Sequence, residues 1–185
     1  MSLSGKIIIE TERLILREMT LHDFDNLKRV IGDRNNMKYF SDIFDYNRVK
    51  IWIKKSIEKY KIFGFGFWAI CLKETGEMIG DCGVTMQNIN GFIRPELGYH
   101  LRADMQGNGY VKESAITTRD WIFNNTPFNQ VFSYMTKENI PSAKTAISYG
   151  CKLLEEYTEE NKTIQVYGIS RKDWEKRAYK KKSVN

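Results

Sequence analysis

The segment from Gln106 to Val111 constrains the fold of this chain most, because it places two glycines between a strand and a helix. A β-rich run over 95–102 precedes it, and apolar residues at helical spacing follow it over 110–125. Glycines at 107 and 109 let backbone N–H groups turn toward one point without a Cβ in the way. The N-terminus of the following helix adds partial positive charge. The segment therefore predicts a pocket for an anion such as a pyrophosphate.

Two other phosphate-binding motifs do not fit this segment. The Walker pattern needs Gly-Lys-Ser/Thr at the start of the helix, which the chain lacks here. The dinucleotide fingerprint needs a third small residue at position 112, where the chain has Lys112. On this segment alone, a glycine-rich turn that binds no ligand remains the alternative.

Hydrophobic periodicity predicts strands with interspersed helices along the whole chain. The expected strands cover 14–17, 65–72, 78–86, 95–102, 130–136, 152–158 and 163–169. The expected helices cover 21–31, 47–62 and 110–125, with a short one from Pro141 to Gly150 and a last one after Ser170. About seven strands with interspersed helices predict an α+β, or mixed α/β, fold. The length of 185 residues, without repeats or linkers, predicts one domain over 1–185.

Composition narrows the class of protein. The longest uncharged apolar stretch, 62–72, is shorter than the roughly 20 residues that cross a bilayer, and the first residues lack a secretory h-region. We therefore expect a cytoplasmic protein without a membrane partner. Three scattered cysteines and two histidines predict reduced thiols and no metal site.

The positive charge is concentrated near the end of the sequence. Seven basic and two acidic residues give the predicted C-terminal helix, 171–182, a charge of +5 out of the net +6. Such a helix could contact nucleic acid, the ribosome or an acidic partner. We favour the alternative, a solvated last helix, because no RNA-binding aromatic motif accompanies the charge.

The glycine segment resembles the acetyl-CoA pyrophosphate motif of the GNAT N-acetyltransferases, Gln-x-x-Gly-x-Gly/Ala. Gln106, Gly107 and Gly109 match it, and Val111 departs from its last position. Further segments, in the same order, resemble the RimJ/RimL-like branch of ribosomal-protein N-terminal acetyltransferases. They are 11–17, 96–99, Tyr110 with Glu113, Asn139 to Ser142 followed by Gly150, and 169–174. After Gly150 the chain has Cys151 where that branch has a Phe. The resemblance covers roughly residues 8–176.

The resemblance implies a fold and a cofactor site. The GNAT fold is a mixed, mostly antiparallel sheet with helices on both faces. Its sheet splays between the fourth and fifth strands, here 95–102 and 130–136, where acetyl-CoA enters. The implied cofactor-binding residues are Leu101, Gln106, Gly107, Asn108, Gly109, Tyr110, Val111, Asn139, Ser142 and Tyr149. A backbone N–H near Leu101 would polarise the thioester carbonyl, and no metal is required.

Three residues are candidates for catalysis. Ser142, in the first turn of its helix, would stabilise the negative charge that develops on the leaving thiolate. Many GNAT members use a tyrosine acid for this purpose, but the chain has Ala146 at that position. Asn139 would bridge the splayed strand and the pantetheine arm. Glu96 would act as the base for the amine. The alternatives are a capping role for Ser142, an Asx-type turn for Asn139 and a salt-bridged or cap-accepting carboxylate for Glu96.

The expected reaction is direct attack of a primary amine on acetyl-CoA within a ternary complex. The amine would belong to a protein N-terminus or to a small molecule. A polyamine or antibiotic acceptor is an alternative, for which Asp42, Asp45 and Glu96 are the acidic residues available. Val111 and the missing tyrosine leave open a non-catalytic acyl-CoA-binding regulatory module. Both a monomer and a homodimer are compatible with the sequence.

Overall fold

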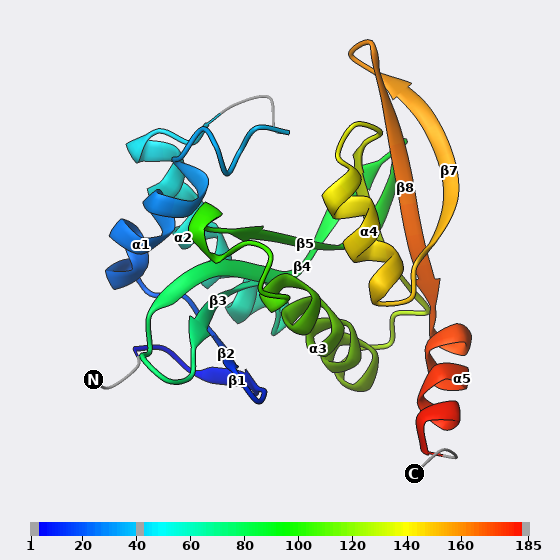
Figure 1. The fold of residues 1–185 in the computed structure, drawn as a ribbon, viewed down its shortest axis with the longest axis horizontal. Helices are drawn as coiled ribbons and strands as arrows, with labels where there is room; N and C mark the ends of the chain where they lie inside the picture. Colours follow the sequence, from blue (N-terminus) through cyan, green and yellow to red (C-terminus); the bar gives the residue numbers. More distant parts are fainter. Residues whose placement is uncertain (1–3, 40–42, 183–185) are drawn as a thin grey trace. The chain divides into compact units, whose positions relative to one another are not determined.

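A computed structural model describes residues 4–39 and 43–182 of the chain (Figure 1). The strands are β1 (Ile7–Glu10), β2 (Leu14–Arg17), β3 (Phe67–Leu72), β4 (Met78–Ile89), β5 (Phe92–Leu101), β6 (Gln130–Thr136), β7 (Lys152–Glu159) and β8 (Lys162–Ser170). The α-helices are α1 (Phe24–Ile31), α2 (Tyr46–Phe63), α3 (Tyr110–Asn125), α4 (Ile140–Ser148) and α5 (Arg171–Lys182). Short 3-10 helices cover Leu21–Asp23 and Ala103–Met105.

The predicted mixed α/β class is confirmed, with one strand more than expected. The added strand is β1, which pairs antiparallel with β2 across the turn at 11–13. The short helix α4 begins at Ile140, one residue before Pro141. Local signals set the ends of α2: the Asp45 side chain accepts a hydrogen bond from the Arg48 N–H at 2.8 Å, and Gly64 ends the helix with a φ of 76°.

The strands form one sheet in the order β1-β2-β3-β4-β5-β6-β8-β7. Antiparallel pairs join β1 to β2, β2 to β3, β3 to β4, β6 to β8 and β7 to β8. Strands β5 and β6 pair in parallel, with Glu96 opposite Phe132. The sheet is therefore mixed and mostly antiparallel, as the resemblance to the GNAT fold implies.

The chain forms two compact units, and each is described by itself. Unit 1 contains residues 1–85 and 98–118, and unit 2 contains 86–97 and 119–185. The boundaries between the units fall within β4, within β5 and within α3. Whether 1–185 acts as one domain stays a prediction.

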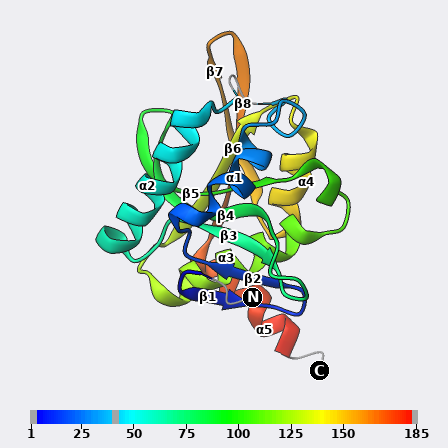
Figure 2. The same ribbon diagram turned by 90° about the vertical axis from the view of Figure 1, so that its left-hand side faces the viewer.

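In unit 1, helices cover both faces of the sheet. The Trp52 indole on α2 donates to Asp81 on β4 at 2.9 Å, whereas Cys82, the next residue of β4, lies 3.5 Å from the Thr118 hydroxyl on α3. Successive strand residues point to opposite faces, so α2 and α3 lie on opposite sides of β4. The core under α1 and α2 is apolar and includes Leu27, Ile53 and Ala69. Figure 2 shows β1, β2 and β3 side by side, in agreement with their pairing.

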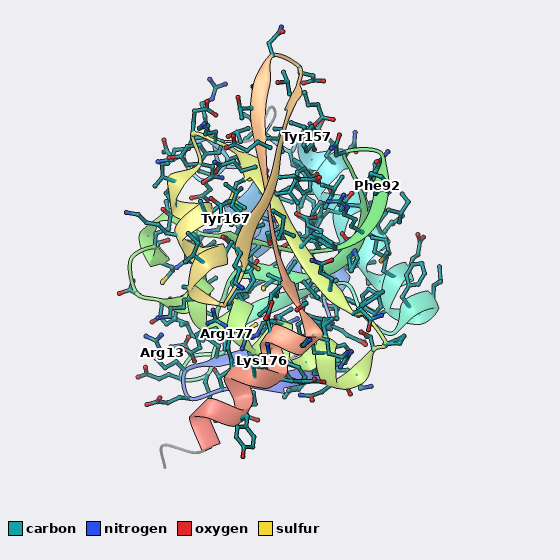
Figure 3. The ribbon with its side chains drawn as sticks, turned by 90° about the vertical axis from the view of Figure 1, so that its right-hand side faces the viewer. Arg13, Phe92, Tyr157, Tyr167, Lys176 and Arg177 are labelled. Carbon is teal, nitrogen blue, oxygen red and sulfur yellow. The ribbon has the colours of Figure 1, made fainter. Side chains whose placement is uncertain are left out.

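In unit 2, α4 packs against β6 and β8, and α5 follows directly from β8. Figure 3 shows the long β7–β8 hairpin, with Tyr157 and Tyr167 labelled, and α5 with Lys176 and Arg177. Arg171 fixes the start of α5, because its guanidinium donates to the carbonyls of Phe123, Thr126 and Phe128. The Trp174 indole donates to Asp120 at 2.6 Å.

Within the part of the chain that the structure describes, no helix is both long enough and apolar enough to cross a membrane.

Candidate functional site

The glycine loop, defined here as residues 106–109, lies in unit 1 at the start of α3. Gly107 and Gly109 have φ angles of 81° and 79°, in the left-handed region that glycine adopts without strain. The Gly109 carbonyl accepts a hydrogen bond from the Glu113 N–H at 3.0 Å, so Gly109 stands directly before the helix. The first N–H groups of a helix have no partner within it, and here they lie beside an exposed loop. The loop can therefore offer N–H donors to an anion.

The loop is fixed at its entrance by polar contacts with the end of β5. Gln106 Nε2 donates to the Leu101 carbonyl at 3.5 Å, and Leu101 itself is buried. Arg102 makes ion pairs of 2.6 Å with both Glu77 and Asp104. Hydrogen bonds to Asp104 and Glu77 raise the pKa of the Arg102 guanidinium and outweigh the effect of burial. These contacts hold the chain as it leaves the strand.

Inside the loop, Asn108 fixes the turn. Its side-chain Nδ2 donates to the carbonyls of Met105 and Gln106, at 3.2 and 3.3 Å. Tyr110 begins α3, and Val111 follows it, half-buried, with its carbonyl accepting from the Ser114 hydroxyl at 3.0 Å. The structure thus groups the predicted residues of the loop in one short segment.

Asn139 and Ser142 meet at the start of α4 in unit 2. Asn139 is buried and is the N-cap of the helix, because its Oδ1 accepts from the Ser142 N–H at 3.3 Å. The capping role that the sequence offered for Ser142 is therefore taken by the Asn139 side chain. Ser142 lies in the first turn and is half-buried, and its hydroxyl is not the N-cap. A catalytic role for either residue stays a prediction.

Tyr149 lies in the interior of unit 2. Its side chain is fully buried, and its hydroxyl lies 2.5 Å from the Ser133 hydroxyl on β6. Its carbonyl accepts a hydrogen bond from Arg119. A cofactor contact by Tyr149 stays a prediction.

Glu96 lies on β5 opposite Phe132 and is half-buried. Glu96 also has a neighbour that the sequence did not indicate, Tyr134, which lies two residues after Phe132 on β6. Burial, and second to it the charge of Glu96, raise the pKa of the Tyr134 phenol to about 12. The phenol is therefore neutral at pH 7 and can donate a hydrogen bond. Alternation along 130–136 places Phe132 and Tyr134 on one face, which is the signal that could have found it.

The other acidic residues considered for a cationic acceptor take different places. Asp45 caps α2, and Asp42 lies outside the described residues. Asp81 is fully buried in unit 1, between the Trp52 indole and the His100 ring, whose Nδ1 lies 2.8 Å from its carboxylate. Over residues 4–39 and 43–182, the His, Cys, Asp and Glu side chains form no group of three that could hold a metal ion.

A sequence profile described as Acetyltransferase (GNAT) domain matches residues 13–152, which is most of the chain. The chain belongs to the GNAT acetyltransferase family. The N-acetyltransferase p20 of Bacillus licheniformis is 32% identical to this GNAT chain over 168 residues, which cover 86% of the chain and 93% of p20. The prediction of the family is confirmed.

Solved structures share the fold of this GNAT chain. The acetyltransferase of Agrobacterium tumefaciens str. C58 superposes with a TM-score of 0.77 at 27% identity, over 91% of this chain and 98% of that one. RimL, described as a ribosomal L7/L12 α-N-protein acetyltransferase in complex with coenzyme A, superposes with a TM-score of 0.74 at 16% identity, over 89% and 98%. At that identity the likeness to RimL shows the fold.

The family assignment makes this GNAT chain an acetyl-CoA-dependent N-acetyltransferase, and the reaction of the family transfers an acetyl group from acetyl-CoA to an amine. The residues of the glycine loop suit such a cofactor. A Cβ built at Gly107 would meet nothing within 4 Å, and one built at Gly109 would meet only Arg13, at 3.5 Å. The space beside both glycines is open to a ligand.

Proposed function

We propose that this enzyme acetylates a primary amine, either the α-amine of a protein N-terminus or an amine of a small molecule, by direct attack on acetyl-CoA in a ternary complex. The observation that carries the proposal is the glycine loop with two left-handed glycines directly before α3. Backbone N–H donors at a helix N-terminus bind phosphate well, because the dipole and the donors act together. The pyrophosphate of the cofactor is the anion assigned to this loop.

Ser142 is proposed to stabilise the thiolate of the leaving coenzyme A. Its place in the first turn of α4 supports this role, since partial positive charge and a hydroxyl both favour a developing negative charge there. Asn139 is proposed to orient this turn and the pantetheine arm. The N-cap bond from Asn139 to the Ser142 N–H supports the orienting part of that role.

Glu96 is proposed to take the proton from the attacking amine through a water molecule. An α-amine has a pKa of about 7.7–8.0, so a mild base is sufficient at neutral pH. The neutral phenol of Tyr134 supports this role for Glu96. A neutral phenol can donate a hydrogen bond that orients a carboxylate, and it adds no second negative charge beside it. The N–H of Leu101 is proposed to polarise the thioester carbonyl.

Membership of the RimJ/RimL-like branch is part of the proposal. The motifs at 11–17, 96–99 and 139–142 support it, together with the fold shared with RimL, whose described substrate is a ribosomal protein N-terminus. A protein α-amine is accordingly the first acceptor to test.

The test is a thiol-release assay with acetyl-CoA against a panel of N-terminal peptides, polyamines and aminoglycosides. The three cysteines are buried, so they give little background with a thiol reagent. Turnover with a peptide or a small amine is the expected result. Tight binding of acetyl-CoA without turnover on any amine would support the non-catalytic acyl-CoA-binding module instead.

A further inference from the structure

Arg13, labelled in Figure 3, lies in the turn between β1 and β2. Its side chain contacts both the glycine loop and helix α3. Its Nη1 donates to the Asn108 carbonyl at 3.0 Å. Its Nε and Nη2 lie 2.7 and 2.6 Å from Oε2 of Glu113. The guanidinium also lies over the Tyr110 ring, 4.8 Å from its centroid. Arg13 therefore connects the N-terminal turn, the loop and the first turns of α3.

Glu113 is itself held from several sides. Its Oε1 accepts from the Thr11 hydroxyl at 2.6 Å and from the Arg13 backbone N–H at 3.2 Å. Burial raises the pKa of Glu113, but the hydrogen bonds from Thr11 and Arg13 outweigh it and leave the pKa below its usual value. Glu113 is therefore ionised at neutral pH and neutralises most of the charge of Arg13.

The contact with Asn108 determines which way one peptide group of the loop points. The Asn108 carbonyl and the Gly109 N–H belong to the same planar trans peptide and point in opposite directions. Because Arg13 holds the carbonyl on its own side, the Gly109 N–H is directed away from Arg13. Gly109 adopts either sign of φ at little cost, so this peptide could turn over if nothing held it.

We propose that Arg13 is a positioning residue for the cofactor: it fixes the Asn108–Gly109 peptide so that the Gly109 N–H is presented to the pyrophosphate. The inference rests on the proposed function of the loop. Arg13 acts through the backbone, since its own charge is paired with Glu113. Arg13 should therefore strengthen the binding of ligands that contain the pyrophosphate. It should have no effect on a ligand that contains only the pantetheine part.

The test compares two ligands in Arg13→Gln. Binding of coenzyme A, measured by calorimetry, is expected to weaken about tenfold, as for the loss of one hydrogen bond to a charged group. Turnover with S-acetylpantetheine, which lacks the pyrophosphate, is expected to stay at the wild-type level. Lys73→Gln is the matched control: Lys73 has the same 44% side-chain exposure as Arg13 and a 2.6 Å ion pair with Glu10, also in unit 1.

Arg13→Lys separates geometry from charge. It keeps the positive charge and a pairing with Glu113, but it lacks the planar fork that reaches both Glu113 and the Asn108 carbonyl. The same tenfold loss for coenzyme A supports the proposal. Wild-type affinity in Arg13→Gln or Arg13→Lys, or an equal loss with S-acetylpantetheine, overturns it. Absence of coenzyme A binding by the wild-type protein would count against the proposed function of the loop itself.

Discussion

The Ser133 hydroxyl on β6 donates a hydrogen bond to the Leu97 carbonyl on β5. This bond follows directly after the parallel pairing of Glu96 with Phe132. Ser133 is buried, and its oxygen also lies 2.5 Å from the Tyr149 hydroxyl. Since the carbonyl of Leu97 can only accept, the Ser133 proton goes to it and Tyr149 donates to Ser133. A side chain thus satisfies a strand carbonyl where the two strands meet.

Ser133→Ala is expected to destabilise the protein by about 1–3 kcal/mol, because it leaves the Leu97 carbonyl and the Tyr149 hydroxyl without this buried partner. For a chain of this size the melting temperature should fall by about 2–4 °C for each kcal/mol. Thermal unfolding of Ser148→Ala is the control, since the exposed Ser148 hydroxyl donates to the Thr145 carbonyl within the same helix, α4. An unchanged melting temperature in Ser133→Ala would show that this bond contributes nothing to stability.

Gly109→Val is expected to abolish stabilisation by acetyl-CoA. At 100 times its dissociation constant, the cofactor should raise the free energy of unfolding of the wild type by about 2.7 kcal/mol. Valine strains the backbone at a φ of 79°, and its Cβ would lie 3.5 Å from Nη2 of Arg13, so the loop should no longer present its N–H groups to the phosphate. Gly91→Val is the control, because Gly91 has a φ of 80° and open space around it but lies in the β4–β5 turn. Equal thermal shifts with acetyl-CoA in both variants would show that the loop is not the binding site of the pyrophosphate.

Local signals account for what the sequence predicted well. The predicted helix 110–125 has the same bounds as α3, because a left-handed glycine precedes it and its apolar spacing is regular. Thr20 and Asp23, three residues apart, form a capping box in which the Thr20 N–H donates to the Asp23 carboxylate at 2.7 Å. In each case the interacting groups lie within a few residues of one another.

The features that the sequence did not predict depend on residues far apart in the chain. β1 is only four residues long, and its pairing with β2 defines it more than its composition does. Ser133 and Leu97 are 36 residues apart, and Arg13 and Glu113 are 100 apart. Periodicity and spacing describe single elements, so contacts between elements require the tertiary structure.

Ser142→Ala is expected to lower kcat about 100-fold or more and to leave the affinity for acetyl-CoA nearly unchanged. The proposed bond forms to charge that develops on sulfur in the transition state, so ground-state binding does not use it. The N-cap is kept, because it consists of the Asn139 side chain and the Ser142 backbone N–H. Thr145→Ala is the control, since its hydroxyl bonds to the Pro141 carbonyl one turn away. Single-turnover rates that match the wild type would assign Ser142 a purely structural role.

The thiols are expected to resist modification and to make the protein sensitive to alkali. Burial raises the pKa of Cys71 to about 11 and those of Cys82 and Cys151 to about 12, from 9.0. Above about pH 9 the unfolded chain loses thiol protons that the folded chain keeps, so the free energy of unfolding should fall as pH rises. Urea titrations at pH 7, 9 and 10 measure this slope. A thiol count near zero in native buffer, against three in denaturant, checks the burial.

Glu96→Gln is expected to lower activity most at low pH, where more of the acceptor amine is protonated and must lose its proton. Glutamine keeps the shape of the side chain and removes its charge, so the profile of kcat/KM against pH should shift toward alkaline pH. A less basic acceptor amine should partly restore the rate. Tyr134→Phe is the companion variant: it removes the phenol beside Glu96 while keeping the ring in its apolar cluster, and it should change the profile less than Glu96→Gln does. Superimposable profiles of equal height for the wild type and Glu96→Gln would exclude Glu96 as the base, whereas the family reaction would stand.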